Sequence, residues 1–188
     1  MVEWFHYIQM ERKIMEKNKI SLIVVRISAI LLCLLTMIMI FLFSAQNAGK
    51  SSDESRAITD AVVRLLYPDF AERPASEQKE IRGKVETFVR KTAHFLEFAL
   101  LGISASLILR TFSKKPLFTY VIPIAFGTLY AVTDEIHQLF VSGRAGRFTD
   151  VLIDALGTAV GVFILGLIIM IIRKISKKHR SDIDKAEI

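Results

Sequence analysis

The chain has 188 residues, of which 52% are hydrophobic, and the hydrophobic residues lie in long blocks. This composition excludes an ordinary soluble domain and indicates one membrane-embedded domain. The net charge of +6 does not indicate a nucleic-acid partner, because Lys and Arg flank the apolar blocks, where they would anchor membrane spans. The single cysteine, Cys33, excludes an internal disulfide, and no Cys/His spacing predicts a zinc site.

The first apolar block, residues 20–43, is long enough to cross a bilayer as a helix. It follows a polar head of residues 1–19. The block is longer than the apolar core of a cleaved signal peptide, so we expect an uncleaved anchor. Arg26 lies near its start, from where a long side chain can extend to the membrane surface.

Residues 44–90 form a polar segment of mixed charge. Ser51-x-x-Glu54 matches a capping box and predicts the start of a helix. The apolar face predicted for this helix comprises Ile58, Val62 and Leu65. A second helix is predicted from about Ser76, and no helix breaker separates it from the next apolar block. These helices could lie on the membrane surface, cover the ends of the spans, or form an ordinary connecting domain.

Three further apolar blocks, at residues 91–109, 117–138 and 151–172, are also long enough to span a membrane, and a basic tail follows at 173–188. The predicted fold class is an all-α, polytopic membrane protein with four transmembrane helices. Both termini of such a bundle lie on the same side of the membrane.

The distribution of Lys and Arg predicts which side this is. The head carries four, the loop 110–116 three and the tail six, whereas the loop 139–149 carries two. The segment 44–91 carries nine, but these are dispersed among acidic residues. We therefore expect both termini in the cytoplasm and the segment between the first two spans outside the cytoplasm.

Ionisable residues lie at the outer ends of three of these spans. A charged side chain at the centre of a bilayer costs roughly 2.5–3.5 kcal/mol, so such a group indicates a functional site. The residues are His94 and Glu97 in the second span, Asp134, Glu135, His137 and Gln138 in the third, and Asp150 and Asp154 in the fourth. Because the spans alternate in direction, these residues should meet at one level. Headgroup contact and polar packing between helices are the alternative interpretations.

The fourth span also carries Gly157-x-x-x-Gly161, a small-residue motif that permits close helix approach. The two glycines share a helical stripe with Asp150 and Asp154, so these acids should face the interior of the bundle. Leucine at Gly161 is expected to disturb packing more than leucine at Val162.

Several of these motifs resemble the VanZ-like family of bacterial membrane proteins. The resemblance is carried by Asp134-Glu135-x-His137-Gln138 followed by Arg144 and Asp150, by Lys91-x-x-His94-x-x-Glu97, and by Phe43-Ser44-Ala45-Gln46. It extends over about residues 27–172 and implies a four-helix, multi-pass membrane domain at residues 20–172 in the bacterial plasma membrane. The chain departs from the family pattern at Glu97, where an aromatic residue is common, and at Asp154, near which an amide is common. The family is named for a teicoplanin-resistance determinant, so the resemblance implies a cell-envelope role and glycopeptide resistance, but no settled reaction.

The first functional hypothesis is binding of an anionic envelope lipid or a lipid-linked cell-wall precursor. Arg144 and Arg147 can hold phosphate, and neighbouring glycines allow close backbone approach. The residues predicted to bind the ligand are Lys91, Gln138, Arg144, Arg147, Asp150 and Asp154. The alternative for the arginines is anchoring to headgroups.

The second hypothesis is a membrane-embedded hydrolase or transferase that acts on a polyprenyl-linked precursor. His94 or His137 would act as the base, oriented by Glu97 or Asp134, and Glu135 completes the catalytic candidates. Asp and His could instead hold a divalent metal that activates water, although no HExxH motif is present. A proton relay or a structural helper protein, which would need an oligomer for transport, is the third hypothesis.

Overall fold

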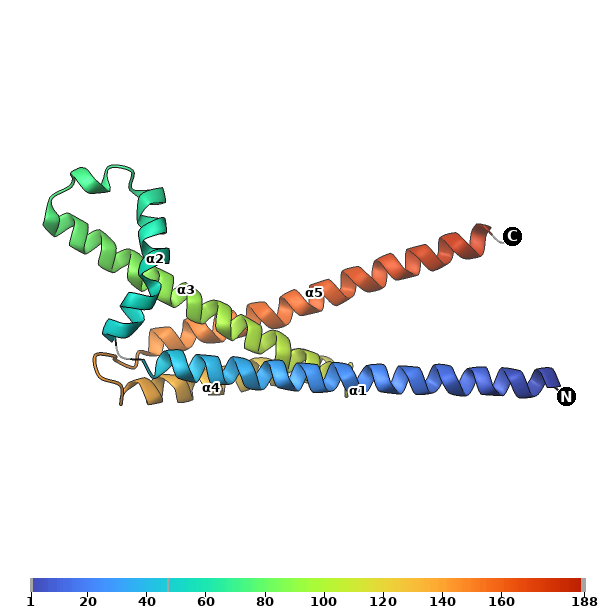
Figure 1. The fold of residues 1–188 in the computed structure, drawn as a ribbon. Coiled ribbons are helices and arrows are strands. Elements are labelled where there is room, and N and C mark those ends of the chain that lie inside the picture. The colour runs from blue at the N-terminus through green and yellow to red at the C-terminus, as the bar shows by residue number, and fades with distance from the viewer. Residues whose placement is uncertain (1, 47, 187–188) are drawn as a thin grey trace.

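The computed structural model describes the backbone of residues 2–46 and 48–186, and the side chains of residues 19–46 and 56–178. These residues contain helices and no strand, which confirms the all-α fold class. The order is α1 (Val2–Ser44), α2 (Ala48–Leu66), the short 3-10 helix η1 (Phe70–Glu72), α3 (Ala75–Arg110), the π-helical η2 (Leu117–Val121), α4 (Ile122–Gln138) and α5 (Phe148–Ala186) (Figure 1).

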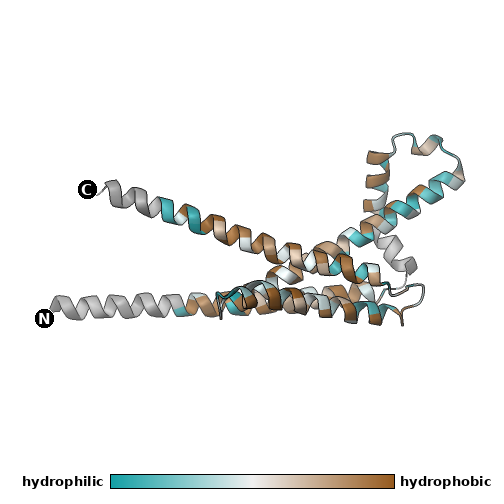
Figure 2. Cartoon of the chain, turned by 180° about the vertical axis from the view of Figure 1, so that it is seen from behind, coloured by the Kyte–Doolittle hydropathy of each residue, from teal (hydrophilic) through white to brown (hydrophobic). Residues whose placement is uncertain are grey.

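Four of these helices are long and apolar enough to cross a membrane. The candidate spans are Lys19–Ser44, Ala75–Arg110, Leu117–Gln138 and Phe148–Lys178. Large apolar side chains cover their outer surfaces; Leu31 is 60% exposed and Leu129 is 67% exposed. Figure 2 shows hydrophobic residues along these helices and a mixture of polar and hydrophobic residues on α2. Such a surface is suited to lipid rather than water.

Close packing of α3 against α5 forms the centre of the bundle. A methyl group at Gly157 would collide with the carbonyl oxygen of Phe95, and one at Gly161 would collide with that of Ala99. The predicted glycine stripe therefore faces another helix, as expected from the motif. Val162 is 0% exposed and lies in the core, so it does not face lipid, and the milder effect of leucine at this position stays a prediction.

Thr158 fills the space between α3 and α4 at the same crossing. A methyl group at Gly102 would meet the Thr158 backbone, and one at Gly127 would meet the Thr158 side chain. Thr158 is 0% exposed, and its hydroxyl donates to the carbonyl oxygen of Asp154 at 3.1 Å. The polar atom is thus satisfied by its own helix, which allows it to be buried.

The π-helical start of the third span follows from Pro123. Proline has no N–H to donate to the carbonyl of residue 119, four positions earlier. The hydroxyl of Ser106 on α3 donates to the Thr119 carbonyl oxygen instead, at 2.7 Å. This hydrogen bond also fixes η2, at the start of the third span, against α3.

The helix predicted from about Ser76 is continuous with the second span, and together they form α3. This helix extends beyond the bundle, and α2 packs against it (Figure 1). The capping-box prediction is wrong, because α2 begins at Ala48, three residues before Ser51. The buried positions of α2 include Thr59 and Val63, each 2% exposed, and Asp60 pairs with Arg82 of α3 at 2.8 Å.

The apolar face predicted for α2 is left largely uncovered by the protein. Ile58 is 59% exposed and Leu65 is 78% exposed. The side of α2 that faces α3 is instead the adjacent one, which carries Thr59, Val63 and the Asp60–Arg82 ion pair.

Arg26 of α1 is held at the end of α3. Its guanidinium donates to the hydroxyl and carbonyl oxygens of Thr111, at 3.1 and 2.9 Å, and lies 4.2 Å from the centre of the Phe112 ring. A helix ends with unpaired carbonyls, which attract a cation. Arg26 therefore connects α1 to the end of α3 that is remote from the polar cluster.

Candidate functional site

The middle of α3, the last turn of α4, the first turns of α5 and the loop between α4 and α5 surround a cavity of about 120 Å³. This is room for several water molecules or for a group of phosphate size. The cavity is lined by Arg90, Lys91, His94, Glu135, Gln138, Gly143, Arg144, Ala145, Arg147, Asp150, Ile153 and Asp154. The structure thus brings most of the site residues predicted from the sequence to one place.

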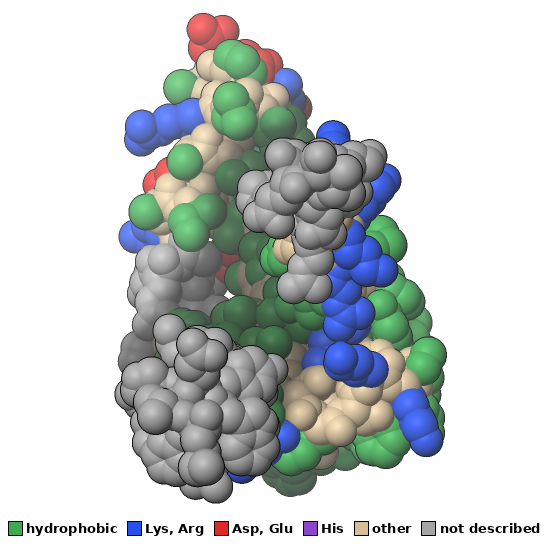
Figure 3. All heavy atoms as spheres, turned by 90° about the vertical axis from the view of Figure 1, so that its right-hand side faces the viewer, with side chains coloured by type: hydrophobic (Ala, Val, Ile, Leu, Met, Phe, Trp, Pro, Cys, Tyr) green, Lys and Arg blue, Asp and Glu red, His purple; other side chains and the backbone are tan. Residues whose placement is uncertain are grey.

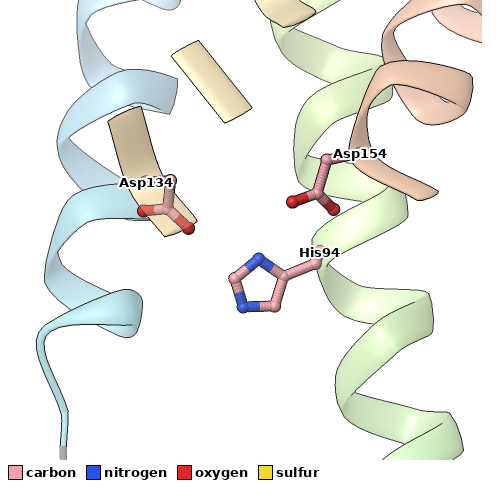
Figure 4. A group of neighbouring side chains, drawn as sticks. All are labelled: His94, Asp134 and Asp154. Atoms are coloured by element: carbon pink, nitrogen blue, oxygen red, sulfur yellow. The ribbon is translucent and has the colours of Figure 1, made fainter. Parts of the chain in front are cut away.

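His94, Asp134 and Asp154 form a cluster that we call the floor of this site; His94 and Asp154 line the cavity, whereas Asp134 adjoins them without lining it. One ligand-type atom from each side chain lies within 4.8 Å of the other two. Figure 4 shows the imidazole of His94 pointing into the space between the two carboxylates. The three residues come from α3, α4 and α5 respectively, so their meeting depends on how these helices pack.

The floor contains buried polar atoms without a hydrogen-bond partner. Asp154 is 2% exposed, and its Oδ2 accepts no hydrogen bond from the described residues. The same is true of Nδ1 of His94 and of Oε2 of Glu97, one turn further along α3. An unsatisfied buried polar group costs about 1–3 kcal/mol, and more when it is charged. Their concentration at one place makes it a candidate site for a ligand or for bound water.

Asp134 is held in position from two sides. Ser44 at the end of α1 donates its hydroxyl to Asp134 Oδ2 at 2.8 Å, and Gln138 donates Nε2 to the same oxygen at 2.9 Å. Asp134 is 4% exposed and Ser44 is 0% exposed. Both hydrogen bonds end on Oδ2, and among the described residues no hydrogen bond to Oδ1 is found.

The mouth of the cavity is rich in cationic side chains. Nζ of Lys91 lies 2.5 Å from Oδ1 of Asp150, and both side chains are partly exposed. Arg90 and Arg147 also line the cavity. The backbone N–H of Arg147 donates to Oε2 of Glu135 at 2.7 Å. Glu135 therefore fixes the loop before α5, while the guanidinium of Arg147 stays at the surface.

Arg144 connects the loop between α4 and α5 to the end of α1. Its guanidinium donates to the carbonyl oxygens of Phe43 and Gln46, at 2.9 and 2.8 Å. These are carbonyls at the end of a helix, where a cation is favoured. Burial lowers the pKa of Arg144, as does the nearby Arg90 cation, whereas Asp134 raises it. The preceding Gly143 has a φ of 77°, which an L side chain rarely adopts.

His137 is separated from the floor. Its ring stacks on Phe41 of α1, with the ring centres 4.7 Å apart, and it does not line the cavity. Its Nε2 is buried without a partner in the described residues. The structure thus distinguishes the two histidines that the sequence treats as equivalent: His94 lies between the carboxylates and His137 packs beside α1.

Two residues with hydrogen-bonding or charged side chains at the site, Ser44 and Arg90, were not among the predicted site residues. Ser44 is the last residue of α1 and binds Asp134, and Arg90 lies beside Lys91 at the mouth. A serine that directly follows an apolar span was the available signal for Ser44. The position of Arg90 follows only from the continuity of α3 through residues 75–110.

The sequence model of the VanZ/LLP1 family matches residues 29–171. The chain belongs to the VanZ/LLP1 family. No curated protein and no solved structure matches the chain. The region matched by the VanZ/LLP1 model contains all the residues of the floor and mouth, and it confirms the resemblance noted from the motifs. With four membrane-spanning candidates, the chain is a VanZ-like membrane protein.

Proposed function

We propose that this VanZ-like protein binds the anionic headgroup of an envelope lipid or a lipid-linked cell-wall precursor. The observation that supports this function is the cavity at one end of the bundle, whose lining includes four cationic side chains: Arg90, Lys91, Arg144 and Arg147. Lys91 is paired with Asp150, and Arg144 binds helix carbonyls. Arg90 and Arg147 are therefore the cations assigned to phosphate.

A lipid is a suitable ligand because the cavity lies at the end of helices with apolar outer surfaces. A chain can remain in the bilayer while its headgroup enters from the membrane surface. The arginine side chain binds phosphate with two parallel N–H donors, which favours phosphate over a neutral headgroup. The volume of about 120 Å³ is suited to the headgroup alone.

The proposed orientation places both termini in the cytoplasm and the cavity on the outer side. The end of the bundle opposite the cavity carries Lys114, Lys115, Arg173, Lys174, Lys177 and Lys178. Figure 3 views this end and shows Lys and Arg side chains gathered on its described surface. Basic residues of this kind favour the cytoplasmic side. In a bacterial plasma membrane the cavity would then face the cell wall, where sequestering a precursor could contribute to teicoplanin-type resistance.

Lipid retention in nanodiscs tests the proposal. Full-length protein in phosphatidylcholine nanodiscs would be incubated with a polyprenyl phosphate, with phosphatidylglycerol, or with inorganic phosphate as competitor, and bound lipid would be quantified by mass spectrometry. Replacing Arg90 and Arg147 by glutamine should weaken retention about 10–100-fold, as expected for losing charge-assisted hydrogen bonds. The matched control is glutamine at Lys114 and Lys177, on the opposite end. Equal retention by both double variants would contradict the proposal.

The position of His94 favours a second candidate function, hydrolysis of a lipid-linked phosphoester or pyrophosphate. An imidazole between two carboxylates can accept a proton from water while the carboxylates stabilise the resulting cation. Release of inorganic phosphate from polyprenyl pyrophosphate would distinguish hydrolysis from binding alone. His94→Gln should abolish this release while lipid retention persists. Retention without release by the wild-type protein would limit the function to binding.

A further inference from the structure

We infer that His94, Asp134 and Asp154 bind one divalent metal ion at the floor of the cavity. The inference goes beyond the proposed function, because the ion requires only these three side chains and no lipid. Each residue comes from a different helix, and one nitrogen or oxygen atom of each lies within 4.8 Å of the other two.

The separation of these atoms is close to that of ligands around one ion. Imidazole nitrogen and carboxylate oxygen bind zinc at about 2.0–2.2 Å, so at the tetrahedral angle two ligand atoms lie roughly 3.3–3.6 Å apart. Small side-chain rotations would therefore bring the three atoms into contact with an ion. Figure 4 shows that the side chains already converge on a common space.

The unpaired atoms provide an independent indication of a ligand. Asp154 is 98% buried, as its exposure is 2%, and Oδ2 has no hydrogen-bond partner in the described residues. Nδ1 of His94 is also buried and unpaired. A metal ion would satisfy both atoms at once and offset the repulsion between the carboxylates of Asp154 and Asp134.

Asp134 has the supporting contacts that a metal ligand needs. Ser44 and Gln138 donate hydrogen bonds to Oδ2, at 2.8 and 2.9 Å, and thereby fix the carboxylate. Carboxylates that bind metals are commonly held by such outer contacts.

The ligand set favours Zn²⁺ or Mn²⁺. One imidazole and two carboxylates form a mixed nitrogen and oxygen set, whereas Ca²⁺ prefers six to eight oxygen ligands. Three protein ligands leave at least one coordination position open, as in catalytic rather than structural zinc sites. His94 and Asp154 both line the cavity, so this open position faces the cavity, where a phosphate oxygen or a water molecule can bind.

Metal binding by the purified full-length protein tests the inference. After chelation and removal of the chelator, protein in detergent would be equilibrated with Zn²⁺ or Mn²⁺ alone, passed through a desalting column, and analysed for metal by mass spectrometry. About one ion per chain is expected, with an increase in melting temperature, because the ion binds the folded state. Asp154→Asn and His94→Gln should each lower the affinity for the metal ion by at least ~10-fold, because each removes one of its ligands. Loss of a residue that only supports a ligand already has an effect of this size.

His137→Gln is the matched control. The substitution is the same as at His94, and His137 lies near the same end of the bundle. The ring of His137, however, stacks on Phe41, and His137 is not one of the three floor residues. Metal content should be unchanged. Binding of Co²⁺ gives a second readout, because ligand-field absorption reports nitrogen and oxygen ligands and should be altered in Asp154→Asn but not in His137→Gln.

Two results would overturn the inference. A wild-type protein that remains folded, retains neither ion and shows no shift in melting temperature would indicate that the three residues share protons instead. Equal metal content in wild type, Asp154→Asn and His94→Gln would place the ion elsewhere. Lipid retention measured in EDTA distinguishes either failure from failure of the proposed function, because the assigned phosphate contacts of Arg90 and Arg147 do not need the ion.

Discussion

Replacing Gly161 by alanine would test the contact between α3 and α5 that positions the floor of the site. The added methyl group would collide with the backbone carbonyl oxygen of Ala99, which cannot move away by a side-chain rotation. The helices would therefore have to separate. Gly161 lies two turns from Asp154 on the same stripe, so separation would also move Asp154 away from His94.

The magnitude follows from two opposing effects. Alanine in place of glycine within a helix stabilises by up to about 1 kcal/mol. Overpacking of a well-packed interior destabilises by about 1–3 kcal/mol, and a backbone contact belongs at the upper end. Gly161→Ala should therefore be destabilising by about 1–2 kcal/mol. Gly161→Leu adds three more carbon atoms and should prevent close packing altogether.

Gly83 offers a matched control in the same helix pair. It lies in α3, and a methyl group there would meet nothing within 4 Å. Gly83→Ala should therefore be neutral or stabilising by about 0.4–1 kcal/mol. The two identical substitutions should differ by about 2 kcal/mol, or roughly 4–8 °C in melting temperature for a chain of this size.

The assay is thermal unfolding in detergent, with the folded fraction followed by size-exclusion chromatography after heating. Phe163→Leu is a further control, because Phe163 is 58% exposed, unlike the core residue Val162. If Gly161→Ala and Gly83→Ala unfold at the same temperature, the α3–α5 contact is looser than described. The acids above Gly161 would then lose the packing that holds them inside the bundle.

Three other predictions concern the site and its orientation. Ser142→Cys in a Cys33→Ser background should react with an impermeant thiol reagent added outside cells, and labelling only after lysis would reverse the orientation. Asp134→Ala and Asp150→Ala should each abolish the envelope phenotype while the protein still reaches the membrane. The double variant should be little worse than either single variant, as expected for residues that act together. Normal function of either single variant would show that the cluster is dispensable. Ser44→Ala should lower metal affinity by about 10-fold while Asp134 is retained, and unchanged affinity would mean that the Ser44 hydrogen bond does not support the ligand.

Controls for the envelope phenotype lie at the other end of the bundle. Lys114→Ala and Lys177→Ala should have almost no effect, because both residues are remote from the cavity. Membrane content must be measured beside the phenotype. A purely structural role for the acids would lower the amount of protein, whereas a functional role leaves inactive protein in the membrane.

The sequence by itself determined the membrane helices and the end at which their polar residues gather. Apolar blocks of about 20 residues can satisfy their backbone in a bilayer only as helices, and successive spans must alternate in direction. This places His94, Asp134 and Asp154 at one level without any tertiary information. The glycine stripe on α5 was also readable, because Gly157 and Gly161 recur at the helical period.

Only the tertiary structure decided which of these residues meet. Asp134 and His137 are three residues apart, which is about 60° around a helix. That angle is small enough to suggest one face, yet the packing of α1 against α4 turns His137 onto Phe41 and leaves Asp134 toward His94. The partners of the long cationic side chains could not be predicted from the sequence for a related reason. Arg26 and Arg144 can reach many partners, and they bind carbonyl oxygens at helix ends. The positions of these helix ends depend on the fold.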